Sequence, residues 1–417
     1  MTFERRRLAN WLTLGAAYAA LYVARYNLSL ANEPLSRAYG WSRGEVGAVV
    51  SVGFAVYGVA AALNGPLVDR IGGRAAMLAG LAGAAAANLA FGLAGLSGLP
   101  PRVLAPVLAL VWAVNGYFQS FSALSLVKVN AAWFGLRERG TFSAIFSGVI
   151  QCGRAAVVLL AGAVLARGSW PWMFVVPAAL AAAAFVACRA IVRDAPSDCG
   201  FAADAEPAPA GAVPLRELLA RPVVRTIALA QLCTGIVRHG FEQWFPRYLV
   251  EVHGLAVDDA RFQGSAFAVV AAGIAAAVVA GRVSDRVCGG RRAPVAFAGY
   301  ALQLGCGALI AGSRDLSVLW IAFVGQAAGI TVVHAMLAGT APMDFGGRAA
   351  AATAAGVFDG MHYLGGAVAG AGLGLLVDRA GWGAWAPAMM ATSAVGLALM
   401  VRVWKVSPAA PAPAPRP

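Results

Sequence analysis

The sequence predicts an all-α polytopic membrane protein with twelve transmembrane helices in two pseudo-symmetric halves of six helices each. The first observation is composition, because 60% of the 417 residues are hydrophobic and only 12% are charged, whereas soluble domains carry about 25% charged residues. The second is that apolar runs of about 18 residues or more, long enough to cross a bilayer, recur along the chain. The third is that both halves repeat one order of features, an arginine inside an early apolar helix and a short basic loop after the next helix.

The predicted helices begin directly after the basic segment MTFERRR. The apolar stretch behind it is too long for the core of a cleavable signal peptide and lacks a clear small-residue cleavage site, so it is expected to remain as the first helix. Apolar runs bounded by loop residues predict the other spans to within a few residues. The expected spans are residues 10–31, 44–66, 75–97, 103–130, 141–166, 170–192, 223–249, 263–284, 293–312, 316–338, 350–376 and 382–404.

A polar segment divides the spans into two sets of six. We expect an N-terminal half at 1–192, a cytoplasmic linker at 193–222, a C-terminal half at 223–405 and a disordered tail at 406–417. The linker is rich in proline, alanine and charge, so it is not expected to bury a core. The tail is proline-rich, which is typical of a disordered end.

The formal net charge of +13 indicates membrane topology rather than nucleic-acid binding. About 20 of the 32 lysines and arginines fall at one predicted membrane face and about 8 at the other, as the positive-inside rule expects. This asymmetry places both termini in the cytoplasm. We therefore expect a protein of the bacterial inner membrane that contacts the lipid bilayer and binds no nucleic acid.

Two arginines lie inside apolar helices, Arg25 in the first predicted span and Arg238 in the seventh. An arginine at the bilayer centre costs about 2.5–3.5 kcal/mol on insertion scales, so such residues usually face the interior of a bundle and mark a site. A guanidinium offers a planar fork of donors that fits phosphate or carboxylate oxygens, and it keeps its charge. One buried arginine from each half predicts a single anion site between the halves.

Two basic loops carry related motifs. The loop GPLVDRIGGR (65–74) fits the pattern G-x-L-x-D-R-x-G-x-R, and GRVSDRVCGGRR (281–292) is a degenerate copy. Both resemble the signature loops of the major facilitator superfamily, which implies the twelve-helix major facilitator fold. Charged side chains at these helix ends are candidates for a latch that holds one conformation on the cytoplasmic side. The candidate latch residues are Asp69, Arg70, Arg74, Asp285 and Arg286.

Several stretches resemble one branch of that superfamily, the organophosphate:phosphate antiporter family. They are YVARYN (22–27), NGYFQ (115–119), WFGLRERG (133–140), RDAPSDCGF (193–201), VRHGFEQWFPRYL (237–249) and HYLGGAVAG (362–370). The resemblance implies a rocker-switch exchanger of an organophosphate, or a related phosphorylated or phosphonate anion, against inorganic phosphate. In it Arg25 and Arg238 would clamp the phosphoryl group beside Tyr22. It also implies a monomer. No nucleotide-binding, catalytic or metal-ligand motif is found, so we expect neither an enzyme nor a cofactor nor a bound metal.

Other polar residues in the predicted spans are candidates with open roles. The candidates for lining the substrate site are Lys128, His362 and Tyr363, and the candidate charge or coupling partners are Arg154, Asp359 and Glu242. Glu242 lies one helical turn beyond Arg238 and can pair with it. Arg154 either pairs with Asp359 or supplies a third cation. Asp359 and His362 are three residues apart and so share a helix face.

The chain also departs from the glycerol-phosphate and hexose-phosphate members of the branch. Ala61 and Ile150 stand where the resemblance leads one to expect a lysine in helix two and a histidine in helix five, and Ala123 and Leu124 replace a Trp-Pro step. The organic anion is therefore left open. Two rival functions are a proton-coupled symporter of organic carboxylates, with Asp359 or Glu242 as proton carrier, and a transporter-like membrane sensor of phosphorylated sugars.

Overall fold

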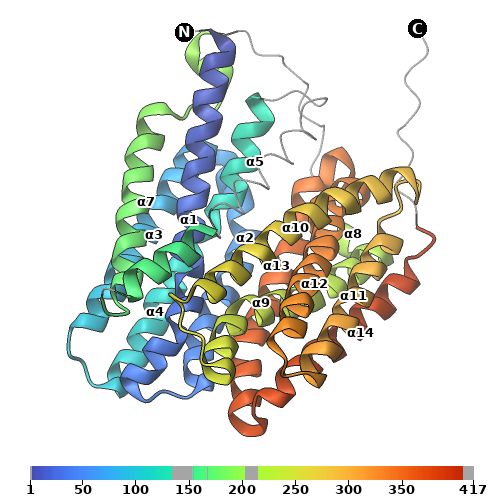
Figure 1. The fold of residues 1–417 in the computed structure, drawn as a ribbon. Helices are drawn as coiled ribbons and strands as arrows, with labels where there is room; N and C mark the ends of the chain where they lie inside the picture. The colour runs from blue at the N-terminus through green and yellow to red at the C-terminus, as the bar shows by residue number, and fades with distance from the viewer. Residues whose placement is uncertain (1, 134–152, 154, 167, 202–214, 407–417) are drawn as a thin grey trace, which may run out of the picture.

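The chain folds into long α-helices, and the part that the structure describes contains no β-strand (Figure 1). The structure is a computed structural model, and it describes residues 2–133, 153, 155–166, 168–201 and 215–406. The first bundle holds α1 (Phe3–Tyr39), α2 (Arg43–Ile71), α3 (Gly73–Leu96), α4 (Pro101–Gln119), α5 (Phe121–Trp133), the unlabelled helix Ala155–Leu165 and α7 (Trp172–Ile191). The second bundle holds α9 (Pro222–His253), α10 (Ala260–Arg286), α11 (Arg292–Gly312), α12 (Leu316–His334), α13 (Ala341–Ala380) and α14 (Trp385–Arg402).

Helix ends follow local sequence signals. Ser42 forms a capping box at the start of α2, where its hydroxyl accepts a hydrogen bond from the Glu45 backbone N–H and the Glu45 carboxylate accepts one from the Ser42 N–H. Gly40 ends α1 in the left-handed conformation, with φ of 67°, which glycine adopts without steric cost. The short α1–α2 connection that results turns the chain back through the membrane.

The predicted all-helical membrane fold is confirmed. Among the described residues, nine helices are long and apolar enough to cross a membrane. Each of the twelve expected spans coincides with a helix, the fifth through its described part Ala155–Leu165.

Helix lengths and connections differ from the expectation in three places. The first helix is expected at 10–31, whereas α1 runs over 37 residues and continues beyond the apolar stretch at both ends. The fourth span is divided at Ser120 into α4 and α5. The loop expected after the tenth span is helical, because α12 passes through a π-helical turn, η2 (Ala335–Thr340), directly into α13.

The expected linker is partly ordered. It contains the 3₁₀ turn η1 (Pro196–Cys199) and the short helix α8 (Leu215–Ala220). Leu218 of α8 is fully buried against apolar residues of the second bundle, including Val224 and Ile227. The division into halves and linker stays a prediction, and α8 adds one leucine to the apolar core of the second bundle.

Glycines let the two bundles touch through their backbones. A Cβ atom added to Gly58 of α2 would lie 3.0 Å from the carbonyl oxygen of Gly360 on α13. Gly47 and Gly370 oppose each other on the same two helices. Small residues are favoured where membrane helices approach closely, since lipid removes the hydrophobic drive for association. The α2–α13 crossing therefore fixes how the halves meet.

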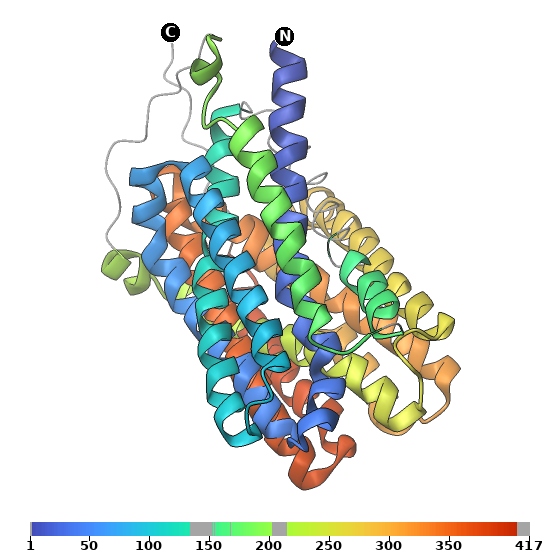
Figure 2. The same ribbon diagram turned by 90° about the vertical axis from the view of Figure 1, so that its left-hand side faces the viewer.

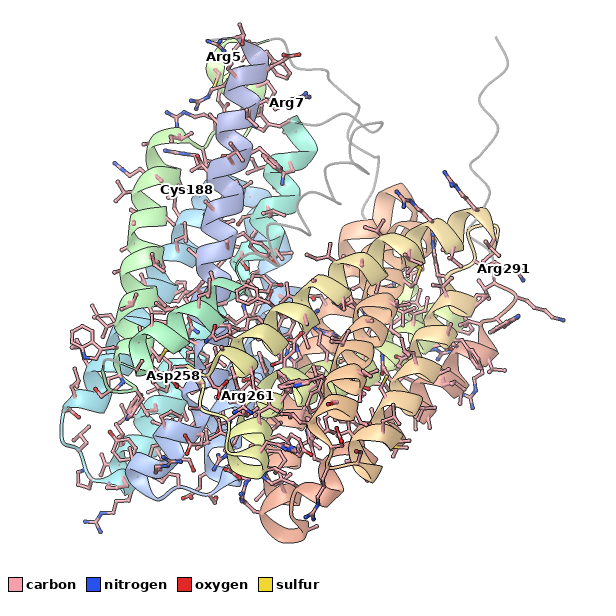
Figure 3. The ribbon with its side chains drawn as sticks, in the orientation of Figure 1. Arg5, Arg7, Cys188, Asp258, Arg261 and Arg291 are labelled. Atoms are coloured by element: carbon pink, nitrogen blue, oxygen red, sulfur yellow. The ribbon has the colours of Figure 1, made fainter. Side chains whose placement is uncertain are left out.

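The two bundles converge at one end and diverge toward the end that carries both chain termini (Figure 1). We call these the far side and the terminal side. Figure 2 shows the first bundle from its outer face, where α7 packs beside α1 and α3. Figure 3 places Arg5 and Arg7 at the terminal side, and it places Asp258 and Arg261 near the opposite end of α10 from Arg291.

Candidate functional site

Arg25 is held at the centre of the molecule by neutral groups from both bundles. Its side chain is buried, with the residue only 4% exposed. Its Nε and one terminal nitrogen donate to the Gln119 side-chain oxygen at 3.1 and 2.9 Å, and that nitrogen also donates to Ser122 Oγ at 3.0 Å. The other terminal nitrogen donates to the hydroxyl oxygen of Tyr363, on α13 of the second bundle, at 2.7 Å. Arg25 thus links the two halves. None of these partners carries a charge that would neutralise its guanidinium.

The interruption at Ser120 positions the partners of Arg25. Ser120 Oγ accepts a hydrogen bond from the Asn64 side-chain amide at 2.8 Å, and Ser122 Oγ donates to the Gln119 backbone carbonyl. Serine side chains that bond nearby backbone carbonyls commonly bend membrane helices. Gln119 and Ser122 lie on either side of this interruption, and both accept hydrogen bonds from Arg25. Neither residue is among the site candidates predicted from the sequence, although each is an uncharged polar residue within an apolar span.

Tyrosine rings surround the Arg25 guanidinium. Its central carbon lies 5.0 Å from the ring centroid of Tyr22 and 4.8 Å from that of Tyr57, distances typical of cation–π contacts. The rings of Tyr57 and Tyr363 lie 3.8 Å apart, and Tyr22 stacks on Tyr26 at 5.4 Å. The structure therefore brings Tyr22 and Tyr363 to Arg25, and it adds Tyr57, which the sequence analysis did not select.

Arg238, on α9, approaches the same space from the second bundle. It is 8% exposed, and its Nε donates to Glu242 Oε1 at 3.0 Å in an i, i+4 ion pair. In the described part of the chain its two terminal nitrogens make no hydrogen bond. Both Arg238 and Arg25 interact electrostatically with Tyr22 and Tyr363. The two arginines therefore share one set of neighbours, and Arg238 retains donors for a ligand.

Asp359 is a half-buried carboxylate on α13, one helical turn before Tyr363. It interacts electrostatically with both Arg25 and Arg238. Among the described residues it makes neither an ion pair nor a hydrogen bond. Arg154, the other partner that the sequence analysis considered for it, lies outside the described residues.

His362 lies in a cluster of three histidines behind the tyrosines. Its ring centroid is 5.0 Å from that of His239 on α9 and 4.8 Å from that of His334 on α12. His362 is 1% exposed and packs edge-on against Tyr363. It supports the site from behind rather than contacting Arg25. Lys128 is half-buried on α5, between Arg25's partner Ser122 and the terminal side.

A second polar network joins the bundles at the far side. Arg43, at the start of α2, pairs with Glu251 of α9 and with Asp378 of α13 at 3.3 Å. Arg247 pairs with the same Glu251 at 2.5 Å and donates to Asn32 of α1 at 2.8 Å. We call these residues, with Trp382, whose indole donates to Glu251, the far-side network. It was not predicted from the sequence, because its members lie on α1, α2, α9, α13 and the 3₁₀ turn η3 (Trp382–Ala384).

A match to a protein-family model decides the family. The model of the Major Facilitator Superfamily matches residues 14–370. The chain belongs to this superfamily. The curated relatives include the glycerol-3-phosphate transporter of Bacillus subtilis, 27% identical over 96% of this chain and 93% of the relative. They also include a "probable hexose phosphate transport protein" of Chlamydia trachomatis, 25% identical over 97% and 92%. A third is the membrane sensor protein UhpC of Salmonella typhimurium, 25% identical over 89% and 85%.

A solved structure supports the major facilitator fold. A bacterial homologue of the human lysosomal transporter Spinster, in an inward-facing and unoccupied conformation, matches with a TM-score of 0.71 over 95% of this chain and 94% of that one. The sequences are 16% identical, so this likeness concerns the fold alone.

The signature loops of this major facilitator protein lie at the ends of α2 and α10, on the terminal side. Arg74 donates to the Arg189 carbonyl at 2.7 Å, and its backbone N–H donates to Asp194, so its described contacts stay inside the first bundle. Arg70 and Arg286 are exposed. The side chains of Asp69 and Asp285 lie outside the described part. The latch role of these five residues stays a prediction, whereas the described ion pairs between the halves lie at the far side.

The far-side network predicts that closure of this side depends on pH. Burial acts to raise the pKa of Glu251, but hydrogen bonds from Arg247 and Arg43 outweigh it and hold the pKa below its ordinary value of 4.5. A carboxyl with a lowered folded pKa stabilises the closed network fully above its ordinary pKa, and loses that contribution as pH falls through the folded value. We expect the far side to stay closed at pH values above the ordinary Glu251 pKa of 4.5, and to lose this contribution as pH falls below it and through the lowered folded pKa.

Spin labels at Arg37→Cys and Arg379→Cys, on exposed far-side positions of the two bundles, report the opening as a longer distance. Glu251→Gln serves as the control, because it should lengthen the distance at pH 7 and remove the pH dependence. A distance that changes between pH 7 and 5 in the unmodified chain would contradict the assignment to Glu251.

Proposed function

We propose that this protein is a secondary active transporter of the bacterial inner membrane that exchanges a phosphate ester or phosphonate for inorganic phosphate. The observation that carries the proposal is the pair Arg25 and Arg238, buried at the centre, one from each bundle, and sharing tyrosine neighbours. Two guanidinium groups match a phosphoryl dianion. The names of the Bacillus and Chlamydia relatives, transporters of glycerol 3-phosphate and hexose phosphate, support the same substrate class.

The proposed mechanism is rocker-switch alternating access by a monomer with both termini in the cytoplasm. With the far-side network formed, the bundles expose the site toward the terminal side. A phosphoryl group entering there replaces Gln119 and Tyr363 as the acceptor for Arg25. It also accepts hydrogen bonds from the terminal nitrogens of Arg238, which have no acceptor within the described part of the chain. Its negative charge offsets the guanidinium charges, so the occupied site can be closed off from water while the empty site resists closure. That penalty couples movement of one anion to return of another.

Exchange predicts that phosphate must be present on both sides of the membrane. Purified protein in vesicles loaded with phosphate should take up radiolabelled phosphate, whereas empty vesicles should take up at least about tenfold less, because two unneutralised charges are costly to occlude. An imposed pH gradient in empty vesicles is the control for the rival mechanism. Equal uptake into empty and loaded vesicles would reject exchange, and uptake driven by the pH gradient alone would identify a proton-coupled symporter.

A sensor is the second candidate, favoured by the match to a membrane sensor protein of Salmonella typhimurium. A sensor would bind the phosphorylated ligand at the same arginines without net flux. Ligand-dependent thermal stabilisation without any exchange in loaded vesicles would select this reading.

A further inference from the structure

Asp359 is a carboxylate at the proposed substrate site that, within the described part of the chain, has no cation bonded to it. Arg238 is already paired with Glu242 at 3.0 Å, and Arg25 directs its donors to Gln119, Ser122 and Tyr363. Among the described residues no hydrogen bond or ion pair reaches Asp359. A half-buried charge without a partner is costly, and charged residues inside membrane bundles usually mark a substrate or ion path. Asp359 is therefore a candidate partner for a cationic group of the substrate.

The helix crossing beside Asp359 supplies aromatic rings. Gly360, the next residue, meets Gly58 at the backbone contact of α13 with α2. That contact brings Tyr57, the neighbour of Gly58, to the same level, and Tyr363 follows Asp359 by one turn with its ring 3.8 Å from that of Tyr57. Asp359 interacts electrostatically with Tyr18, Tyr57 and Tyr363. Aromatic faces beside a carboxylate are a favourable environment for an ammonium group.

The phosphoryl clamp lies next to this place. Arg25 touches the same Tyr57 and Tyr363 rings, and Asp359 interacts with both clamp arginines. An anionic group bound at the arginines and a cationic group bound at Asp359 could therefore belong to one short molecule. A phosphoryl dianion without an ammonium group would bind at the arginines but would gain no favourable contact from Asp359.

We infer that the organic substrate is a zwitterion, a phosphate ester or phosphonate that also carries an amino or quaternary ammonium group, with Asp359 and the Tyr57 and Tyr363 rings binding the cation. The inference rests on the proposed exchange function and names its substrate class. It also gives a reason for the carboxylate in a site built for anions. Phosphoethanolamine has the required chemistry, with one short linker between the two charges.

A pair of isosteric competitors tests the inference directly. Phosphoethanolamine ends in an ammonium group, and n-propyl phosphate has a methyl group at the same position. In phosphate-loaded vesicles, phosphoethanolamine should inhibit uptake of labelled phosphate at a concentration about tenfold lower than n-propyl phosphate, as a carboxylate contact and a cation–π contact together predict. Phosphocholine and 3,3-dimethylbutyl phosphate form a second matched pair for a quaternary ammonium.

Variants assign the preference to Asp359. Asp359→Asn should bring the inhibition ratio of each pair to about one, and Asp359→Glu should restore part of it. Glu33→Gln, a change of carboxylate to amide on α1, is the control and should keep the ratio of the unmodified protein. If Asp359→Asn exchanges too slowly to measure inhibition, the two ligands of each pair are compared by the concentrations that raise Tm equally.

The outcomes separate the inference from the function it rests on. If both members of each pair inhibit the unmodified protein equally while phosphate exchange persists, the zwitterion is rejected and the exchanger stands. That result would also be expected of a carboxylate that carries a proton. If loaded vesicles show no phosphate exchange at all, the proposed function fails, and Tm shifts with the same pairs still decide whether the site prefers a cationic ligand.

Discussion

Lysine in place of Arg25 should lower the initial rate of phosphate exchange by about 100-fold or more. Arg25 uses all three of its guanidinium nitrogens, with Gln119 bound through two of them and Tyr363 of the second bundle through the third. A lysine ammonium is a point charge that cannot reproduce this fork. Hydrogen bonds of a charged group contribute about 1.5–3 kcal/mol each, and about 1.4 kcal/mol corresponds to a tenfold change in rate. The rate is measured as labelled phosphate uptake into loaded vesicles, per mole of reconstituted protein.

Arg37→Lys is the matched control for this substitution. Arg37 lies on the same helix, α1, but its side chain is 78% exposed, and it pairs with Glu33, one turn away. Exposed pairs of this kind contribute about 0–1 kcal/mol, so exchange should stay within about twofold of the unmodified rate. If Arg25→Lys also kept more than half of the rate, Arg25 would not be part of the clamp.

The fold could be predicted because membrane insertion leaves a strong mark on sequence. Each apolar run in the sequence corresponds to a helix in the structure, and the arginine in each half indicated the repeat. Helix ends were less predictable, since helices outside the bilayer are held by tertiary contacts. α1 continues to Tyr39 because its last turns pack against the second bundle through Asn32 and Ser36, which accept hydrogen bonds from Arg247. Nothing in the local sequence specifies that partner.

Of the candidate site, mainly the charged residues could be predicted from the sequence. Arg25, Arg238, Asp359 and Glu242 stand out because a charge in an apolar helix is costly and therefore conspicuous. Tyr57 gave no such signal, since tyrosine is common near membrane interfaces. Its role depends on the α2–α13 crossing, which a single sequence does not show. The far-side network was hidden for the same reason, because Arg43 and Glu251 lie in different halves and meet only after the halves associate.

Alanine in place of Gly235 should destabilise the protein and slow exchange. Gly235 lies on α9, one turn before Arg238, and a Cβ atom there would overlap the backbone carbonyl of His362 on α13. Gly365 of α13 opposes it in the same manner, against the Leu232 carbonyl. The helices would have to separate, and overpacking of this kind costs about 1–3 kcal/mol. Because Arg238 follows Gly235 on α9 and Tyr363 follows His362 on α13, separation would also move two groups of the site.

Gly264→Ala provides the comparison that isolates this backbone contact. Gly264 is a helical glycine of α10 with no atom within 4 Å of an added Cβ, and replacing a helical glycine by alanine stabilises a helix by about 1 kcal/mol. We therefore expect Tm in detergent to fall for Gly235→Ala and to hold or rise for Gly264→Ala, with exchange reduced only in the former. Equal Tm values and equal exchange rates for the two variants would show that α9 and α13 can separate freely at this crossing. The clamp would then not depend on the close approach of these helices, since Arg238 and Tyr363 could shift without loss of phosphate binding.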